Sequence, residues 1–380
     1  MKAIGLDMRM AGKQNGGIGR YAFEIAGQVL KQDLENSYTL FFNQNNIQAS
    51  EIDYFKKFNR VKIVIANIRH YSFREQLQFN KILEKENLDL VHFPNFNVPA
   101  FYKKPFVVTI HDMVHHKISG HKKSRYLQFL AYKKIIEKAA INSKKIITVS
   151  NYSKKDIASY LQVPLQKIKV IYEGSNLNTD VTAETAKEVR QKFYLDKPYF
   201  LFVGILERKK NLINLTRGFD YFLKKYKKNM DLVVVGKVDK HYPEIKFKAM
   251  DIKHKDNLVF ADFVEDADLA ALYKETFAFV SASLHEGFGL PGVEAMKFGI
   301  PLAVSNIEVF NEIYDNSAIY FNPLDPEDIA DKLNLLVKDQ QFYEQQQMHS
   351  WNQGQLYSWE KAGQETLEVY KEILSEQKVL

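Results

Sequence analysis

The stretch TFAFVSASLHEGFGLPGVEAM, residues 276–296, shows most clearly how this chain folds. Its start, TFAFVS, has the apolar, β-rich composition of a buried strand. Its end predicts a helix that opens at Pro291, because proline suits the first helical position. Gly287 and Gly289 lie between the two elements and leave space around the backbone. Because free amides at a helix start attract anions, this strand–loop–helix unit predicts an anion site.

Two carboxylates bracket the predicted anion site. Glu286 lies in the loop at the end of the strand, and Glu294, with seven residues between them, is expected in the first turn of the helix. A phosphate would repel both unless each carboxylate had a hydroxyl partner of its own. A sugar nucleotide supplies such hydroxyls, from the ribose and from the sugar. The alternative is that Glu294 only complements the helix dipole while Glu286 is solvated.

A run of basic residues follows another predicted strand. In FVGILERKKNL, residues 202–212, the strand ends at Gly204, and Arg208, Lys209 and Lys210 come before the next helix. Open α/β sheets bind ligands at the carboxyl ends of their strands, where these cations would lie. Lysine or arginine there can neutralise a diphosphate leaving group without a metal ion. A solvated charged surface is the alternative.

Around these motifs, strand-like runs alternate with helical stretches almost from end to end. Apolar strands that alternate with helices indicate parallel sheets covered on both faces. The polar stretch 176–197 separates two series of such strands and is predicted to be a linker between two doubly wound, Rossmann-like domains, 1–175 and 198–357. The tail, 358–380, is predicted to be one more helix, without a strand to follow it. The strands of the two series are expected at YTLFF, VKIVIA, LDLVHF, FVVTI, KIITVS and IKVIY, and at YFLFVG, DLVVVG, NLVFA, TFAFVS, IPLAVS and AIYF.

A glycine-rich segment near the amino terminus, NGGIGRYAFE at residues 15–24, has the spacing G-x-G-x-x-A of a dinucleotide-binding turn. The loop 8–16 separates it from the first strand, and the second strand ends at Asn43 without the acid that would hold a ribose. Both features argue against a dehydrogenase. Gly17 and Gly19 still allow backbone to approach a phosphate at a helix start, and a plain turn without a ligand is the alternative.

The composition limits the class of protein. With no cysteine, the chain has no disulfide, thiolate zinc site or cysteine nucleophile, and we expect a cytoplasmic location. The start, MKAIGLDMRM, lacks the apolar stretch of a signal peptide, and no run approaches the roughly 20 apolar residues of a membrane span. The net charge of +7 favours an acidic partner, which could be nucleic acid, an anionic membrane or a phosphorylated substrate.

Taken together, the motifs resemble those of the retaining glycosyltransferases of family 4, which have the GT-B fold. The resemblance covers nearly the whole chain and implies two Rossmann-like domains that face each other across a cleft. It also implies a C-terminal helix, 358–380, that packs back on the first domain. The combination is specific for the family and not for a substrate. The matching segments are GGIGRY, VVTIHDM, IITVSNYSKKDI, VGILERKKNL, HEGFGLPGVEAM and YFNPLDPEDIADKL.

The resemblance implies a role for each matching residue. His111 and Glu286 would contact the transferred sugar, and Lys210 would hold the diphosphate, which makes these three the expected catalytic residues. Glu294 would hold the ribose hydroxyls. From the residue type alone, His111 could instead be a satisfied buried histidine. The chain departs from the common family pattern at Arg208, where proline is frequent, at Lys209, where arginine is frequent, and at Ile205, where some members have arginine. The expected donor-binding residues are Gly17, Gly19, Gly204, Arg208, Lys209, Lys210, Gly287, Phe288, Gly289, Leu290 and Glu294.

The family reading implies transfer with retention of the anomeric configuration and no cofactor or metal. Cations and amides would help the phosphate to leave, and its oxygen would then take the proton of the acceptor hydroxyl. A metal site could instead be sought at EDADLAALY, with Asp266 and Asp268. Those acids precede an apolar helical pattern, so we expect them to favour a helix start.

The acceptor and donor are less well defined. GDP-mannose is the first choice of donor on family resemblance, with a UDP- or dTDP-sugar as the alternatives. A basic run between residues 117 and 155 is interleaved with Tyr126, Phe129, Leu130 and Tyr132. It suits either a surface that rests on anionic lipid or a solvated helix. The first of these favours a lipid-linked saccharide at the inner membrane face as the acceptor. A GT-B-fold nucleotide-sugar epimerase and a nucleic-acid-binding protein are the other classes considered, although no recognition helix or aromatic-rich sheet for nucleic acid is evident. The run has one acid, Glu137, and its bases are Lys117, Lys122, Lys123, Arg125, Lys133, Lys134, Lys138, Lys144, Lys145, Lys154 and Lys155.

Overall fold

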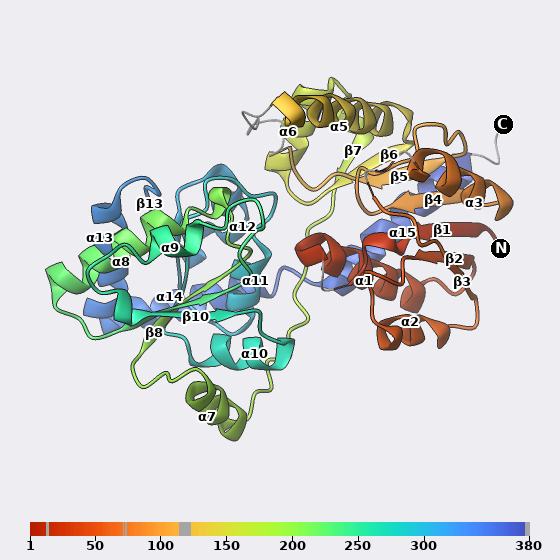
Figure 1. The fold of residues 1–380 in the computed structure, drawn as a ribbon. Coiled ribbons are helices and arrows are strands. Elements are labelled where there is room, and N and C mark those ends of the chain that lie inside the picture. The colour runs from red at the N-terminus through yellow and green to blue at the C-terminus, as the bar shows by residue number, and fades with distance from the viewer. Residues whose placement is uncertain (13–14, 71, 73, 114–122, 377–380) are drawn as a thin grey trace. The chain divides into compact units, whose positions relative to one another are not determined.

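The computed structural model describes residues 1–12, 15–70, 72, 74–113 and 123–376, with side chains from residue 129 onward in the last range. The chain forms two compact units, each with its own sheet and core (Figure 1). The first unit combines residues 1–173 with residues 359–380, and the second comprises residues 174–358.

The first unit is a seven-stranded parallel sheet in the order β3-β2-β1-β4-β5-β6-β7. Its central strands are buried on both faces, as expected when helices cover both sides of a parallel sheet. The strands are β1 (Ala3–Asp7), β2 (Ser37–Phe42), β3 (Val61–Ile65), β4 (Leu90–Phe93), β5 (Phe106–Thr109), β6 (Lys145–Thr148) and β7 (Ile168–Val170). The α-helices are α1 (Gly16–Gln32), α2 (Ala49–Lys56), α3 (Asn80–Lys85), α5 (Lys123–Asn142), α6 (Asn151–Leu161) and α15 (Trp359–Glu376). Short helical turns are η1 (Met8–Met10), η3 (Glu75–Phe79) and η4 (Leu165–Lys167).

The second unit is a six-stranded parallel sheet in the order β10-β9-β8-β11-β12-β13. The strands are β8 (Tyr199–Val203), β9 (Asp231–Val235), β10 (Leu258–Asp262), β11 (Ala278–Ser281), β12 (Leu302–Ser305) and β13 (Ala318–Phe321). The α-helices are α7 (Ala183–Lys192), α8 (Leu212–Tyr226), α9 (Ile245–Ala249), α10 (Asp266–Glu275), α11 (Leu290–Lys297), α12 (Glu308–Tyr314), α13 (Pro326–Lys338) and α14 (Gln340–Gly354). Short turns are η5 (Arg208–Lys210), η6 (Lys255–Asn257) and η7 (Asp315–Ser317).

Both sheets reverse their strand order beside one central strand. In the first unit β1 pairs with β2 on one side and with β4 on the other, and in the second β8 lies between β9 and β11. At such a switch point the loops leave in opposite directions and open a crevice at the carboxyl ends of the strands. The predicted α/β fold with two doubly wound parallel sheets is confirmed.

The segment 176–197, expected as a linker, contains helix α7 and belongs to the second unit. Thr182 caps this helix by accepting a hydrogen bond from Thr185 N, and Ala186 and Val189 are buried. Helix α7 packs against α10. The polar composition of the segment therefore reflects the solvated face of a short helix, because its apolar residues are few and spaced to face one neighbour.

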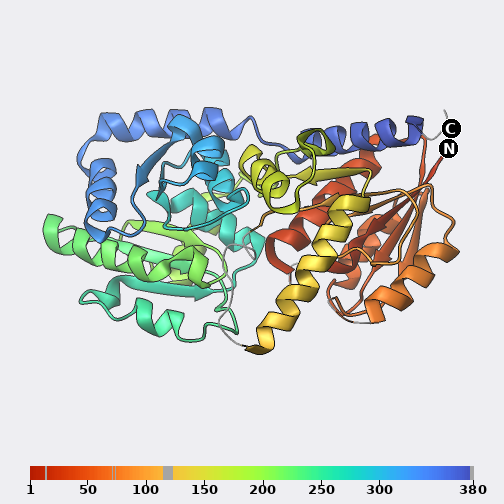
Figure 2. The same cartoon turned by 90° about the horizontal axis from the view of Figure 1, so that it is seen from above.

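The C-terminal helix α15 packs against α1 of the first unit, as the resemblance implied (Figure 2). Gln32 Nε2 donates to Glu360 O over 2.9 Å, and the Tyr21 and Trp359 rings meet edge-on with centroids 6.0 Å apart. Gly363 lets the helices approach, since a Cβ there would lie 2.5 Å from Gln28 Cβ. None of the helices in the described part of the chain combines the length and apolar character needed to cross a bilayer.

Candidate active site

The loops that follow β8 and β11 meet at the switch point of the second sheet. Leu284 N donates to Lys209 O over 2.7 Å, which ties the loop after β11 to the basic turn η5. Lys210 Nζ then lies 2.5 Å from Glu286 Oε1, and both side chains are largely buried. The structure thus joins two residues, 76 positions apart in the sequence, that the motifs predicted separately.

Glu286 is held as a buried carboxylate, with only 8% of its surface exposed. Burial alone would raise the pKa of its carboxyl group. The charges of Lys210 and Lys209, together with hydrogen bonds from Lys210 and Ser283, outweigh burial and lower the pKa of Glu286 below its usual value. Ser283 Oγ donates over 2.7 Å. This serine was not singled out from the sequence, because serine is common in loops.

Gly204 and Gly236 end the neighbouring strands β8 and β9. Gly204 has a φ of +155°, and a Cβ there would lie 3.3 Å from Lys210 Cε. At Gly236, with a φ of +142°, a Cβ would lie 1.9 Å from Gly204 O. The first glycine therefore leaves room for the lysine stem, and the second allows the two strand ends to approach.

The glycine loop before α11 rests on a buried tyrosine. Gly289 is the N-cap of the helix with a φ of +97°, and a Cβ on it would lie 2.2 Å from Tyr314 Oη. The Tyr314 hydroxyl donates to Gly289 O over 2.6 Å. Gly292 is equally crowded, since a Cβ there would lie 2.4 Å from Tyr314 Cζ. Close packing on Tyr314 therefore explains why Gly289 and Gly292 are glycines, whether or not a ligand also approaches the loop.

Helix α11 begins at Leu290, one residue earlier than expected, so Pro291 takes the second helical position. Glu294 correspondingly lies beyond the first turn, which contains no acid, and this weakens the view that it only complements the helix dipole. Glu294 is 2% exposed, and its Oε2 lies 3.0 Å from the Tyr273 hydroxyl. The carboxylate is therefore fixed inside the unit.

The other predicted donor-binding residues of this unit take different positions. The Arg208 guanidinium lies over the Tyr242 ring, 4.9 Å from its centroid. Lys209 Nζ is 3.3 Å from Glu207 Oε1. Phe288 is 3% exposed and packs edge-on against Tyr357, so its side chain belongs to the core. Gly287 lies in the loop before α11, and Leu290 is the first residue of that helix.

In the first unit, both ring nitrogens of His111 face protein oxygens. His111 Nε2 lies 3.0 Å from Pro94 O, and since a carbonyl only accepts, this nitrogen carries the hydrogen. The other nitrogen, Nδ1, is 3.6 Å from Glu173 Oε1. The Tyr21 ring meets the His111 ring edge-on with centroids 4.7 Å apart. His111 follows the carboxyl end of β5 and is held in one orientation.

A buried chain of hydrogen bonds leads from the C-terminal helix towards His111. Tyr370 Oη lies 2.6 Å from His92 Nδ1, His92 Nε2 lies 2.8 Å from Thr109 Oγ1, and Thr109 Oγ1 lies 3.0 Å from Tyr21 Oη. Burial lowers the pKa of His92 to about 3, and the charge of His111 contributes to this shift. His92 is therefore neutral and acts as a link. The sequence did not identify this chain, because its members lie on four separate elements.

Gly17 and Gly19, both expected at the ligand, differ in their surroundings. Each lies in the first turn of α1. A Cβ on Gly19 would lie 2.1 Å from Gly12 O, whereas no atom of the described residues lies within 4 Å of a Cβ on Gly17. Gly19 is therefore needed for packing of the helix on the preceding loop, and of the two glycines Gly17 has the more open surroundings among the residues that the structure describes.

The alternative metal ligands lie at a helix start, as expected. Asp266 and Asp268 are both in the first turn of α10, and Asp268 pairs with Lys192 over 2.6 Å. No three His, Cys, Asp or Glu side chains gather as possible metal ligands within the described ranges.

The basic run lies on and around α5 and α6, and part of it is outside the described residues, namely Lys117 and Lys122. The side chains of Lys123, Arg125 and Tyr126 are likewise outside them. Further along the helix, the exposed Lys133 pairs with the half-buried Glu137 over 3.7 Å. Leu130 is 38% exposed.

Comparisons with known proteins agree with this architecture. Solved glycosyltransferases with the GT-B fold also have two Rossmann-like sheets. Residues 15–179 match the family model for Glycosyltransferase Family 4, and residues 184–352 match the model for Glycosyl transferases group 1. The chain belongs to the group 1 glycosyltransferases with the GT-B fold.

Individual relatives are distant. The O-antigen chain mannosyltransferase RfbU of Salmonella typhimurium is 27% identical over 286 residues, which cover 72% of this chain and 75% of the relative. The uncharacterized glycosyltransferase MJ1607 of Methanocaldococcus jannaschii is 29% identical over 293 residues, 74% of this chain and 73% of the relative. The structure of Anabaena Alr3699/HepE in complex with UDP and glucose superposes with a TM-score of 0.76 at 17% identity, and covers 98% of this chain and 99% of that one.

Proposed function

We propose that this glycosyltransferase moves a hexose, with mannose as first choice, from a nucleotide diphosphate sugar to a saccharide hydroxyl, with retention of configuration and without a metal ion. The observation that carries the proposal is the buried Lys210–Glu286 pair at the carboxyl end of β8, next to the amino end of α11. A lysine, a carboxylate and helix amides at the carboxyl end of one strand can bind phosphate and sugar together.

Each part of the donor has a partner in this proposal. The diphosphate is bound by Lys210, with help from Lys209 and Arg208, because charge-assisted contacts to phosphate are the strongest available. The amides at the start of α11 contact the same phosphates. Glu294 holds the ribose hydroxyls and Glu286 contacts the sugar. In the first unit, Gly17 leaves open space for the donor at the start of α1.

The reaction breaks the bond between the anomeric carbon and the phosphate oxygen, and forms a bond from that carbon to the acceptor oxygen. The acceptor proton passes to the oxygen of the leaving phosphate. Lys210 and the helix amides stabilise the negative charge that develops on the leaving group. Glu286, held as an anion, stabilises positive charge on the sugar ring. His111, held by Pro94 O, contacts the transferred sugar with its ring edge.

The donor and acceptor are proposed from the relatives. RfbU is named a mannosyltransferase of the O-antigen chain, which supports mannose as the sugar and a glycan as the acceptor. HepE binds UDP and glucose, so a UDP-sugar is the alternative donor. The basic segment from residue 117 to residue 155 supports peripheral contact with an anionic membrane at the cytoplasmic face.

A ligand screen tests the donor directly. Thermal shifts are measured with GDP-mannose, UDP-glucose and a dTDP-sugar, for the wild type, Lys210→Ala and Lys338→Ala. The control lysine, Lys338, ends α13 and is exposed. We expect stabilisation by one nucleotide sugar that is lost in Lys210→Ala and kept in Lys338→Ala.

Turnover then separates transfer from epimerisation. With the bound donor, NMR of the glycoside formed is expected to show the donor's anomeric configuration. No stabilisation by any nucleotide sugar would contradict the proposal, and so would an isomerised nucleotide sugar formed without an acceptor.

A further inference from the structure

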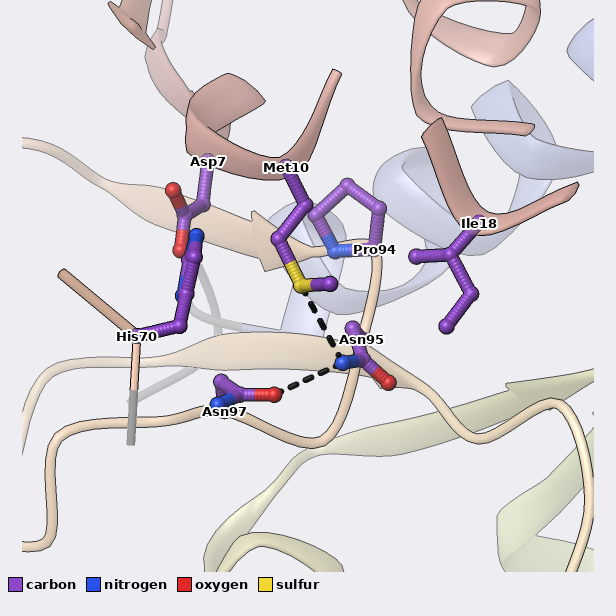
Figure 3. A pocket seen from close by; sticks show the side chains of 7 residues that line it. All are labelled: Asp7, Met10, Ile18, His70, Pro94, Asn95 and Asn97. Atoms are coloured by element: carbon purple, nitrogen blue, oxygen red, sulfur yellow. Dashed lines mark hydrogen bonds between the residues drawn. The ribbon is translucent and has the colours of Figure 1, made fainter. Parts of the chain in front are cut away.

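A small cavity opens at the switch point of the first sheet, where β1 and β4 end side by side (Figure 3). Asp7 is the last residue of β1, and Pro94 and Asn95 directly follow β4. This is the position at which an open parallel sheet binds ligands. None of the residues assigned to the donor or to catalysis lines this cavity. It is lined by Asp7, Met10, Ile18, His70, Pro94, Asn95 and Asn97.

The carboxylate in the cavity wall is rigidly held. Arg9 donates to Asp7 through Nε over 2.8 Å and through Nη2 over 2.7 Å, and it also donates to Glu75 over 3.0 Å. The guanidinium lies 3.4 Å from the centroid of the Phe79 ring and is fully buried. A side chain fixed in this way presents its oxygens in one geometry, which favours recognition of a defined ligand group.

The charge of this cluster disfavours an anion. Asp7 and Glu75 supply two negative charges against one positive charge on Arg9. His70 Nδ1 lies 3.1 Å from Glu75 Oε1, and a protonated His70 would only bring the sum to zero. Among the described residues, these four side chains therefore carry no net positive charge with either form of His70, and a phosphate or carboxylate would gain nothing from them.

Two amides complete the polar part of the wall. Asn95 Nδ2 donates to Asn97 Oδ1 over 2.6 Å and to Met10 Sδ over 3.3 Å. Figure 3 shows the Asn95 oxygen turned away from Asn97. Within the described residues, Asn95 Oδ1 and Asn97 Nδ2 make no hydrogen bond, which leaves one acceptor oxygen and the two N–H groups of one amide nitrogen for a ligand. A hydroxyl group both donates and accepts, so it fits this arrangement.

The cavity adjoins the proposed place of transfer. Pro94 lines it, and the carbonyl of the same residue holds His111 Nε2 over 3.0 Å. Ile18 lies between Gly17 and Gly19 in the first turn of α1. A ligand in the cavity would thus lie beside both the histidine and the open glycine assigned to the donor.

We infer that this cavity binds a hydroxyl or hydroxymethyl group of the acceptor, and that the acceptor's terminal sugar is neutral. The inference rests on the proposed transfer to a saccharide. The cavity is too small for a sugar ring, so the ring would stand at its mouth, with its C–H groups near Met10, Ile18 and Pro94. Asp7 accepts from the hydroxyl, and the two asparagine amides fix its direction.

The test uses neutral methyl α-glycosides of mannose, glucose and galactose as probes, with mannose 6-phosphate as the anionic comparison. Saturation-transfer NMR measures binding of each probe to the wild type and to the variants Asn97→Leu and Ile18→Trp. The tryptophan at position 18, where the native side chain is partly exposed, narrows the cavity. Asn334→Leu, on α13 of the second unit, is the matched control. We expect at least one neutral glycoside to bind, about 5–10-fold more weakly in both cavity variants and unchanged in the control. Loss of one hydrogen bond in Asn97→Leu corresponds to a change of this size, whereas Ile18→Trp acts through the bulk of the new side chain in the cavity wall.

Three results would overturn the inference: no binding of any neutral glycoside to the wild type, binding that both cavity variants leave unchanged, or tighter binding of mannose 6-phosphate. Nucleotide binding is followed in the same samples by thermal shift. It is expected to stay unchanged in Asn97→Leu and Ile18→Trp and to be lost in Lys210→Ala. Failure of donor binding in the wild type contradicts the proposed function, whereas failure of glycoside binding alone contradicts only the acceptor cavity.

Discussion

Replacing Lys210 by methionine should change how the stability of the second unit depends on pH. Methionine keeps the length of the stem beside Gly204 and removes the charge that faces Glu286. Breaking a buried ion pair by removing one partner typically costs about 3–5 kcal/mol. Because Ser283 and the charge of Lys209 still stabilise the carboxylate, we expect about 3 kcal/mol at pH 7.5.

The sign of the pH effect follows from the pKa of Glu286. In the wild type the folded pKa lies below the ordinary value of 4.5, so this group stabilises the fold above that pH and the contribution is lost as the pH falls. In Lys210→Met burial dominates and raises the pKa, so the carboxyl group destabilises the fold at neutral pH and less so in acid. The difference between the two proteins should therefore shrink towards pH 4.5.

The measurement needs a reporter for one unit, because two-unit chains do not unfold in a single step. The chain has two tryptophans, Trp351 in the second unit and Trp359 in the first. In a Trp359→Phe background, urea unfolding followed by Trp351 fluorescence reports on the second unit. Lys338→Met is the control, and Lys210→Met with Glu286→Gln should recover most of the loss. A loss under about 1 kcal/mol, or the same loss at pH 4.5 and pH 7.5, would refute the charge argument.

Three further predictions concern catalysis. Glu294→Gln should mainly raise the donor KM, because the proposed ribose contacts are equal in the ground and transition states. Glu286→Gln should instead lower kcat by about 10²-fold. Steady-state kinetics in which both variants lose only kcat would contradict this division. Activity should survive excess EDTA in a transfer assay, and loss that manganese or magnesium restores would point to Asp266 and Asp268. Tyr370→Phe should lower kcat several-fold with the donor KM unchanged, because it breaks the hydrogen-bond chain that orients Tyr21 beside His111. The NMR signal of the His111 ring is expected to change as well. An unchanged signal together with full activity would exclude an orienting role for Tyr370.

The fold was largely predictable because its pattern is local. Strands buried on both faces appear in the sequence as short apolar runs, and the polar stretches between them mark helices and loops. The segment 176–197 was misjudged for the same reason. Its helix buries only Ala186 and Val189, so its composition resembles that of a linker.

The candidate site, which stays a prediction, could be proposed from the sequence as a set of motifs, but its contacts could not. Nothing in the local sequence shows that Lys210 reaches Glu286 or that Tyr314 supports Gly289, because these contacts depend on which strands are neighbours. The same limit applies to Tyr370 and His92, which are 278 positions apart. Strand order is fixed by the packing of the whole sheet, and no single motif contains that information.

The charges around the basic turn indicate what the proposed donor site would need beyond its lysines. Arg208, Lys209 and Lys210 supply three positive charges, and Glu207 and Glu286 supply two negative ones, so these five side chains sum to +1. A nucleotide diphosphate brings more negative charge than that excess can balance. Lys210 cannot compensate both Glu286 and the phosphates in full. The remaining attraction has to come from the backbone amides at the start of α11, whose geometry depends on Gly289 and the tyrosine beneath it. If this unit binds the donor as proposed, the glycine loop is therefore expected to be as necessary to anion binding as the cations that face it.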